Sequence, residues 1–239
     1  MSDKKQKRFW KTTAVAKDGE GYAIELDQRR IKTPAKAALL LPTRPMAEAV
    51  AAEWDAQKEV INPLSMPVTR SANAAIDKVR HQHREVAEML AAYGDTDLLC
   101  YRADTPEELI ARQSDQWDPA LDWAHETLGA RLIPRNGVIH QPQPEAALAC
   151  LAAPVHRMTE FELAGFHDLV SLSGSLILGF AAAANWRDAD EIWQLSRLDE
   201  NWQEEQWGAD DEAQERTEIK RHAFLHAKRF IDLCRSTLQ

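Results

Sequence analysis

Residues 169–184 read LVSLSGSLILGFAAAA and are the most apolar stretch of the chain. Serine and glycine residues between positions 171 and 175 interrupt it, and it is shorter than the roughly 20 residues that span a bilayer. It follows Thr159-Glu-Phe-Glu162, a capping box that is typical of a helix start. We therefore predict one long helix that ends at Ala184 and lies buried in a helical core.

Helix signals extend over most of the chain on both sides of this stretch. Apolar residues recur at three- and four-residue intervals between Thr69 and Tyr93. Thr105-Pro-Glu-Glu108 is a further capping box, and Asp118-Pro119 predicts the start of another helix. The last two helices are expected at residues 188–206 and 210–234. The chain beyond residue 67 is thus predicted to be almost wholly helical.

The first forty residues have a different pattern. Short β-compatible runs between Phe9 and Leu41 alternate with turn residues, which is typical of a small meander. Thr43 is a helix cap, with Pro45 in the first turn of the helix that follows. The predicted fold class is α+β. We expect a small N-terminal α/β domain over residues 1–67, with a short antiparallel sheet and a helix, and a larger all-α helical bundle domain over residues 68–239.

Composition narrows the class of protein. Hydrophobic residues make up 44% and charged residues 28% of the 239 residues, which argues against a disordered chain and against membrane insertion. The three cysteines are far apart and show no metal-ligand spacing, so neither a disulfide framework nor a zinc site is indicated. The N-terminus has no recognisable targeting signal, and we expect a cytoplasmic protein.

The negative charge is concentrated near the C-terminus. Eleven acidic and only two basic residues lie between Asp190 and Glu218, so this segment accounts for the whole formal net charge of −9. Such a field repels phosphate backbones, and nucleic acid is therefore not an expected partner. The same field would attract a basic protein surface.

Four of the eight tryptophans lie in or beside this acidic segment. Trp186, Trp193 and Trp207 are separated by multiples of seven, so one continuous helix would place them close to one face, with Glu200 between them. Two interpretations stay open. These side chains are either core residues packed against residues 169–184, or anchors of a protein interface ringed by acids.

Catalytic signatures are weak. His222 and His226 are four residues apart and could share a metal on a helix, but the third ligand of such a site is missing. The sequence contains no glycine-rich phosphate loop and no nucleophile elbow. We therefore expect no catalytic residue, metal, cofactor or nucleotide. A small metal-dependent hydrolase using His222 and His226 is the alternative.

Several short motifs along the chain match the pattern of one known family. The matching segments, which lie between residue 8 and about residue 230, are Arg8-Phe-Trp-Lys11, Leu26-Asp-Gln-Arg-Arg30, Ile31-Lys-Thr-Pro-Ala35, Glu53-Trp-Asp-Ala-Gln57, Met66-Pro67, Asn73-Ala-Ala-Ile-Asp77, Asp95-Thr-Asp-Leu-Leu-Cys-Tyr-Arg-Ala103, Arg112-Gln113, Trp117-Asp-Pro119, Leu198-Asp-Glu200, Gln203, Trp207-Gly208, Asp210 and Glu212. Each motif alone is weak, but the set is specific, and it closely resembles the F-type ATP synthase assembly chaperones that bind the alpha subunit of the catalytic head.

The resemblance implies a non-enzymatic chaperone with a small α/β domain and an all-helical domain. Such a protein binds the unassembled alpha subunit and shields its subunit interface until the beta subunit displaces it. It also implies a bacterial, cytoplasmic member, whereas the eukaryotic relatives are mitochondrial. The expected partner-binding residues are Trp193, Asp199, Glu200, Gln203, Trp207, Asp210 and Glu212. A general holdase for many clients is a further alternative.

Overall fold

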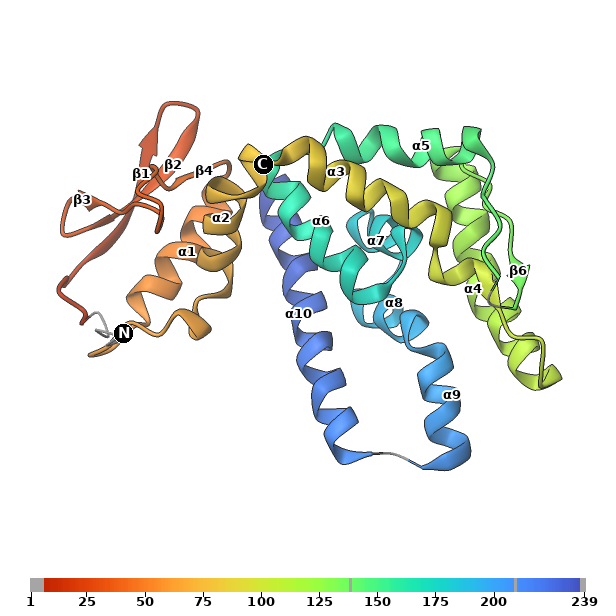
Figure 1. Cartoon of the computed structure of the whole chain (residues 1–239). Coiled ribbons are helices and arrows are strands. Elements are labelled where there is room, and N and C mark those ends of the chain that lie inside the picture. Colours follow the sequence, from red (N-terminus) through yellow and green to blue (C-terminus); the bar gives the residue numbers. More distant parts are fainter. Residues whose placement is uncertain (1–6, 138, 209, 237–239) are drawn as a thin grey trace. The chain divides into compact units, whose positions relative to one another are not determined.

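The computed structural model describes residues 7–137, 139–208 and 210–236 (Figure 1). Internal contacts divide the chain into two compact units. The N-terminal unit comprises residues 1–83, 159–165 and 229–239, and the helical unit comprises residues 84–158 and 166–228. The domain boundary expected at residue 67 stays a prediction.

A short antiparallel sheet forms one layer of the N-terminal unit (Figure 1). Its strands are β1 (Thr13–Asp18), β2 (Gly21–Leu26), β3 (Arg29–Arg30) and β4 (Leu40–Leu41), and β2 pairs with each of the other three. The turn between β2 and β3 consists of Asp27 and Gln28, both with positive φ. A two-residue turn of this kind matches the twist of a hairpin.

Helices α1 (Arg44–Asp55) and α2 (Pro67–Asp77) share one hydrophobic core with this sheet. The Thr43 hydroxyl accepts a hydrogen bond from the Met46 amide at 3.3 Å, so the predicted cap of α1 is confirmed. The Glu53 carboxylate accepts bonds from the first amides of α2, at 2.7 Å and 2.8 Å. This bond pair fixes the start of α2, because the first amides of a helix have no partner within the helix.

The helical unit is built around α7 (Leu176–Ala183), whose eight residues are all buried. The other α-helices that follow α2 are α3 (His83–Ala91), α4 (Glu107–Leu128), α5 (Glu145–His156), α6 (Glu160–Ser173), α8 (Ala189–Ser196), α9 (Leu198–Trp207) and α10 (Asp211–Arg235). Short 3-10 turns occur at η1 (Pro63–Ser65), η2 (Val79–His81), η3 (Ala92–Thr96) and η4 (Leu98–Cys100), and β5 (Tyr101–Arg102) pairs in parallel with β6 (Arg135–Asn136). The predicted α+β fold class is confirmed.

The apolar stretch that defines the core is two helices and not one. The capping box at Thr159 is confirmed, because the Thr159 amide donates to the Glu162 carboxylate and the Glu162 amide donates to the Thr159 hydroxyl. However, α6 ends at Ser173 and α7 begins after Ser175. Gly174 has a φ of 70°, and the Ser175 hydroxyl accepts a bond from the Leu178 amide. A left-handed residue followed by a new cap ends the first helix.

Four other predicted helices also have different limits. Pro119 lies inside α4 and does not start a helix, and Thr105 makes no capping bond to it. Residues 69–93 form α2, η2 and α3. Residues 188–206 form two helices that meet at Arg197, so Trp186, Trp193 and Trp207 do not share one helix face. In the described ranges, every helix is too short or too polar to span a membrane.

Candidate functional site

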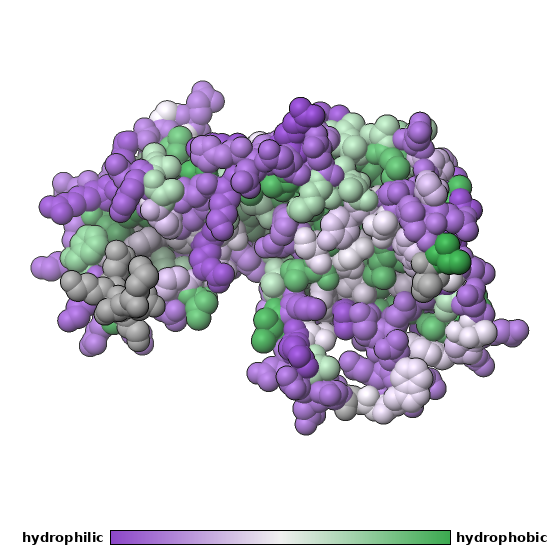
Figure 2. Space-filling view, in the orientation of Figure 1, coloured by the Kyte–Doolittle hydropathy of each residue, from purple (hydrophilic) through white to green (hydrophobic). Residues whose placement is uncertain are grey.

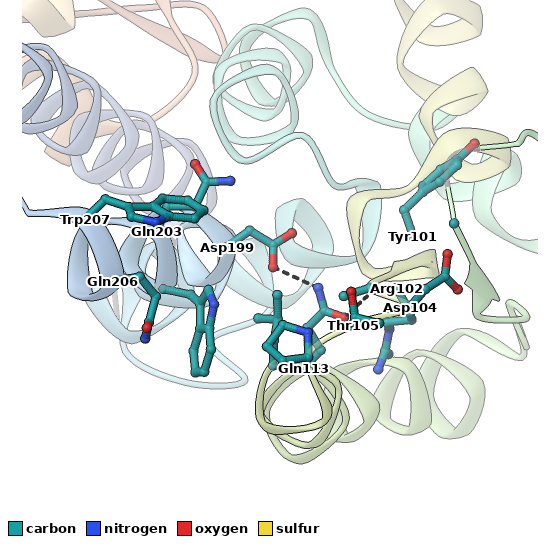
Figure 3. Close-up of a pocket in the computed structure, with 14 residues that line it drawn as sticks. Tyr101, Arg102, Asp104, Thr105, Gln113, Asp199, Gln203, Gln206 and Trp207 are labelled. Carbon is teal, nitrogen blue, oxygen red and sulfur yellow. Dashed lines mark hydrogen bonds between the residues drawn. The ribbon is translucent and has the colours of Figure 1, made fainter.

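One face of α9 lines a groove in the helical unit (Figure 3). Its lining side chains follow a helical spacing and come from Asp199, Trp202, Gln203, Gln206 and Trp207. The opposite wall consists of residues 101–106, Leu109 and Gln113 of α4, and Gly137. The cavity between the walls has a volume of about 580 Å³. This volume is in the range of ligand-binding clefts, roughly 300–1,000 Å³.

Gln113 connects the two walls of the groove. Its side chain is buried, and its Oε1 accepts a hydrogen bond from the Ala103 amide at 2.8 Å. Its Nε2 donates to Oδ1 of Asp199, also at 2.8 Å (Figure 3). Because an amide can accept and donate at once, this one side chain sets the spacing between α9 and residues 101–106.

Arg102 is the cation on the wall opposite α9, and its guanidinium already has hydrogen-bond and ion-pair partners within the protein. Its Nε donates to the Leu99 carbonyl at 2.8 Å, and its Nη2 forms an ion pair with Asp118 at 2.7 Å. The guanidinium also lies over the Trp117 ring, 5.4 Å from the centroid. The side chain is buried, so Arg102 supports the wall and carries no charge that needs a further partner.

Arg112 braces α9 from the α4 side of the groove. Its guanidinium lies over the Trp202 ring at 4.7 Å, and its Nη1 donates to Glu205 at 2.8 Å and 2.9 Å. The hydrogen bond from Arg112 holds the pKa of the Glu205 carboxyl below its usual value. A cation over an indole and a charged hydrogen bond together restrict the rotation of Trp202.

Asp97 fixes the segment that leads into the groove wall. Its buried carboxylate accepts bonds from the Leu99 amide, the Ser175 hydroxyl and the Ile177 amide, at 3.1 Å, 2.7 Å and 3.0 Å. Burial raises the pKa of this carboxyl from 3.8 to about 6, although the hydrogen bonds act in the opposite direction. Asp97 therefore ties η4 to the start of α7 through charged hydrogen bonds.

The structure brings three of the expected partner-binding residues together and separates the other four. Asp199, Gln203 and Trp207 line the groove, and the Trp207 side chain is 80% exposed at its end. Trp193 is only 1% exposed and packs against Phe224 in the core, so it presents no surface to a partner in this conformation.

The remaining expected residues are acids with local partners. Glu200 forms an ion pair with Arg197 at 2.7 Å, and Glu212 forms one with Arg216 at 3.4 Å. Asp210 caps α10, because its carboxylate accepts a bond from the Ala213 amide at 3.0 Å. Figure 2 shows mainly hydrophilic residues over this end of α10. These acids contribute charge near the groove without lining it.

The tryptophans of the acidic segment thus divide between the two interpretations that the sequence left open. Trp193 belongs to the core, and Trp186 packs against Trp123 at 5.9 Å. Trp202 and Trp207 line the groove. The split follows from the break at Arg197, because α8 and α9 direct their side chains separately.

The opposite wall contains residues that the sequence did not predict as site residues. These are Tyr101, Arg102, Asp104 and Gln113. On the α9 side, Trp202 is a further lining residue that was not predicted as a site residue. All but Asp104 and Trp202 lie in motifs that carry the resemblance, at residues 95–103 and 112–113. Their membership in these motifs was therefore the signal that the sequence offered.

The histidine pair does not form a metal cluster with its neighbours. His222 Nε2 lies 3.1 Å from Glu218, but no group of three or more metal-ligating side chains occurs in residues 7–137, 139–208 and 210–236. Burial raises the pKa of the Cys100 thiol to about 12, so this thiol is not a nucleophile at neutral pH.

Comparisons with known proteins agree with this architecture. The family model described as ATP12 chaperone protein matches residues 7–125. The protein named atp12, mitochondrial, of Schizosaccharomyces pombe is 26% identical over 221 residues, which are 87% of this chain and 76% of that protein.

Solved bacterial structures are more similar. The crystal structure of Atp12 from Paracoccus denitrificans has 47% identity and a TM-score of 0.94, with 96% of this chain and 98% of that chain covered. The Atu1473 protein of Agrobacterium tumefaciens has 44% identity and a TM-score of 0.90, with 95% and 85% covered. Since identity is this high over almost the full length of the Paracoccus chain, the protein belongs to the ATP12 chaperone family.

Proposed function

We propose that this protein is an assembly chaperone of the F-type ATP synthase and not an enzyme. It binds the unassembled alpha subunit and shields its subunit interface until the beta subunit displaces it. The observation that carries the proposal is the convergence of three separate motifs on the groove. The motifs at residues 95–103, 112–113 and 198–207 resemble those of alpha-binding chaperones, and side chains from all three line or brace this cavity.

The groove offers the apolar contacts that such a client needs. An unassembled subunit exposes apolar interface area, and this area drives aggregation unless another protein covers it. Tyr101, Trp202 and Trp207 place aromatic surface along the groove, and Trp207 is almost fully exposed. Exposed tryptophan is a common anchor of protein interfaces.

The acids around the groove provide orientation and speed of association. In the described part of the acidic segment, arginines pair with Glu200, Glu205 and Glu212, whereas Asp199 and Glu204 have no cation partner. Residues 190–218 carry eleven acids and two arginines, and this excess produces a long-range field that attracts a basic client surface even where single acids have an arginine partner. We propose that Asp199, Gln203 and Trp207 contact the alpha subunit, and that Glu200, Asp210 and Glu212 contribute to the field.

Release is proposed to occur by competition. If the chaperone covers the surface that the beta subunit later occupies, the two cannot bind the alpha subunit at the same site together. A chaperone interface with few anchors is replaced when the permanent interface is larger and more apolar.

Binding of the purified alpha subunit from the same organism tests the proposal. We expect a complex with the wild type, and we expect Trp207→Ala to weaken it about tenfold or more, since an interface anchor contributes at least about 2 kcal/mol. Leu64→Ala is the matched control, because Leu64 is 78% exposed in the N-terminal unit and lies outside the groove.

Addition of purified beta subunit to the complex should release the chaperone. A stable complex of all three proteins would contradict displacement. Equal binding by wild type and Trp207→Ala would show that the groove is not the contact, and no binding by the wild type would refute the chaperone assignment to the alpha subunit. Protection of unrelated proteins from aggregation, with no preference for the alpha subunit, would favour the general holdase.

A further inference from the structure

We infer that the groove between α9 and residues 101–106 is a subsite for an arginine side chain presented by an extended segment of the client. The client in this inference is the one of the proposed function, but the chemistry of the subsite is argued from the groove alone. Charge, aromatic surface and free amide groups each support it (Figure 3).

The charge of the groove is negative and uncompensated. Two carboxylates line it, those of Asp104 and Asp199. In the described ranges neither has a cation partner, since Asp199 only accepts a hydrogen bond from the Gln113 amide. Arg102, the cation of the lining, is already paired with Asp118. A cation from outside would therefore be attracted to two charges that the protein leaves unpaired.

The aromatic lining favours a guanidinium over an ammonium. Tyr101, Trp202 and Trp207 present ring surfaces beside the carboxylates, together with Pro106 and Leu109. A guanidinium is planar, weakly hydrated and able to stack on a ring while it donates to a carboxylate. The ammonium of lysine is compact and strongly hydrated, so it gains less from this environment.

The chain itself uses this chemistry at the rim of the same groove. Arg112 stacks on Trp202 at 4.7 Å and donates to the Glu205 carboxylate at 2.8 Å. The inferred guanidinium would make the same pair of contacts, with a ring and with an acid, inside the cavity.

Two exposed amides define how the rest of the client segment would lie. Gln203 and Gln206 line the groove on α9, and in the described residues neither side-chain amide has a hydrogen-bond partner. A primary amide can accept from and donate to a peptide main chain at the same time. An extended segment with apolar residues on each side of the arginine therefore fits the groove better than a single free amino acid.

Short peptides test the subsite with the full chain. The probes are acetyl-Phe-Arg-Phe-amide, the same peptide with citrulline, and the same peptide with lysine, titrated in a calorimeter and followed by indole signals in NMR spectra. Citrulline has nearly the shape of arginine without its charge. We expect the arginine peptide to bind about tenfold or more tightly than the citrulline peptide, because hydrogen bonds between charged groups contribute roughly 1.5–3 kcal/mol. The lysine peptide should bind with intermediate affinity.

Conservative variants locate the effect. Asp104→Asn and Asp199→Asn should each reduce the preference for arginine over citrulline several-fold. In the Asp199→Asn variant the new side-chain carbonyl can still accept the bond from Gln113, so the spacing of the walls is kept. Asp115→Asn is the control, since Asp115 is exposed on α4 and does not line the groove. Circular dichroism should be unchanged in all three variants.

Three results would overturn the inference: no detectable binding of the arginine peptide, equal binding of the arginine and citrulline peptides, or a preference that survives in both groove variants. Stronger binding of the lysine peptide would overturn the guanidinium preference. The proposed function is tested separately by the intact alpha subunit. If the alpha subunit binds both groove variants as it binds the wild type, the subsite is wrong and the chaperone function stands. If the alpha subunit binds neither the wild type nor the groove variants while the peptide preference for arginine holds, the proposed function is wrong and the subsite stands.

Discussion

Asp97 gives a stability prediction whose sign and size follow from its surroundings. The carboxyl is completely buried, and this burial raises its pKa from 3.8 to about 6. Between these two pH values the folded protein holds a proton on Asp97 that the unfolded chain has lost. The contribution of this group to the free energy of unfolding is therefore largest below pH 3.8, and it is lost as the pH rises to about 6.

The expected size of this loss follows from the two pKa values. Linkage gives a decrease in the free energy of unfolding of about 2 kcal/mol between pH 4.5 and pH 7.5, caused by this one group. Asp97→Asn removes the titration, so the variant should lack this decrease. Other titrating groups contribute equally to both proteins and cancel in the difference.

Urea unfolding at pH 4.5 and pH 7.5, followed by circular dichroism, measures the effect. Between these pH values the wild type should lose about 2 kcal/mol more than Asp97→Asn. Asp115→Asn, which removes an exposed carboxyl, should follow the wild type. If wild type and Asp97→Asn change in parallel, Asp97 has an ordinary pKa, and its buried hydrogen bonds outweigh the cost of burying its charge.

Two further predictions concern charge and core packing. Glu200→Lys and Glu212→Lys should each weaken binding of the alpha subunit several-fold, chiefly by slower association. Glu126→Lys, the same change on an exposed part of α4, should have less effect. Surface plasmon resonance measures the association and dissociation rates, and equal losses in all three variants would show a general effect of net charge. Trp193→Ala should lower the free energy of unfolding by about 3–5 kcal/mol, because Trp193 is buried in the core. Trp207→Ala should change it by less than about 1 kcal/mol, because Trp207 is exposed. Similar losses in both variants, measured by urea unfolding, would refute this division of the two indoles.

Features encoded by neighbouring residues were predictable from the sequence. The caps at Thr43 and Thr159 were expected and are present, because both residues bond to amides three positions away. The short antiparallel sheet was also expected, since its strands follow each other closely and are joined by turn residues. Such features need no knowledge of distant parts of the chain.

Features created by distant residues were missed. Gly174 and Ser175 form the break between α6 and α7, and Asp97, about eighty positions away, holds it through bonds from the Ser175 hydroxyl and the Ile177 amide. Pro119 was expected to start a helix, but the buried side chains of Trp117, Ala120 and Leu121 keep α4 continuous through it. Tertiary packing of this kind overrides the local signal of a proline.

The candidate site shows the same limit. The α9 side of the groove was reached through the motif that contains Asp199, Gln203 and Trp207. The opposite wall was not, because the bond that brings it to α9 joins Gln113 to Asp199 across 86 positions. Motif matching places residues in a site one segment at a time, and only the fold shows which segments meet.

The construction of the groove is suited to a chaperone that must release its client. Its walls are fixed before binding by Gln113, Arg102 and Arg112, so little ordering entropy is lost when a client segment enters. Its contacts are few, since most of the recognition that we infer is carried by one exposed indole and by two carboxylates that have no cation partner among the described residues. Charge makes encounter fast, whereas the small apolar area keeps dissociation fast as well. A partner with a larger apolar interface can therefore replace the chaperone without any input of chemical energy.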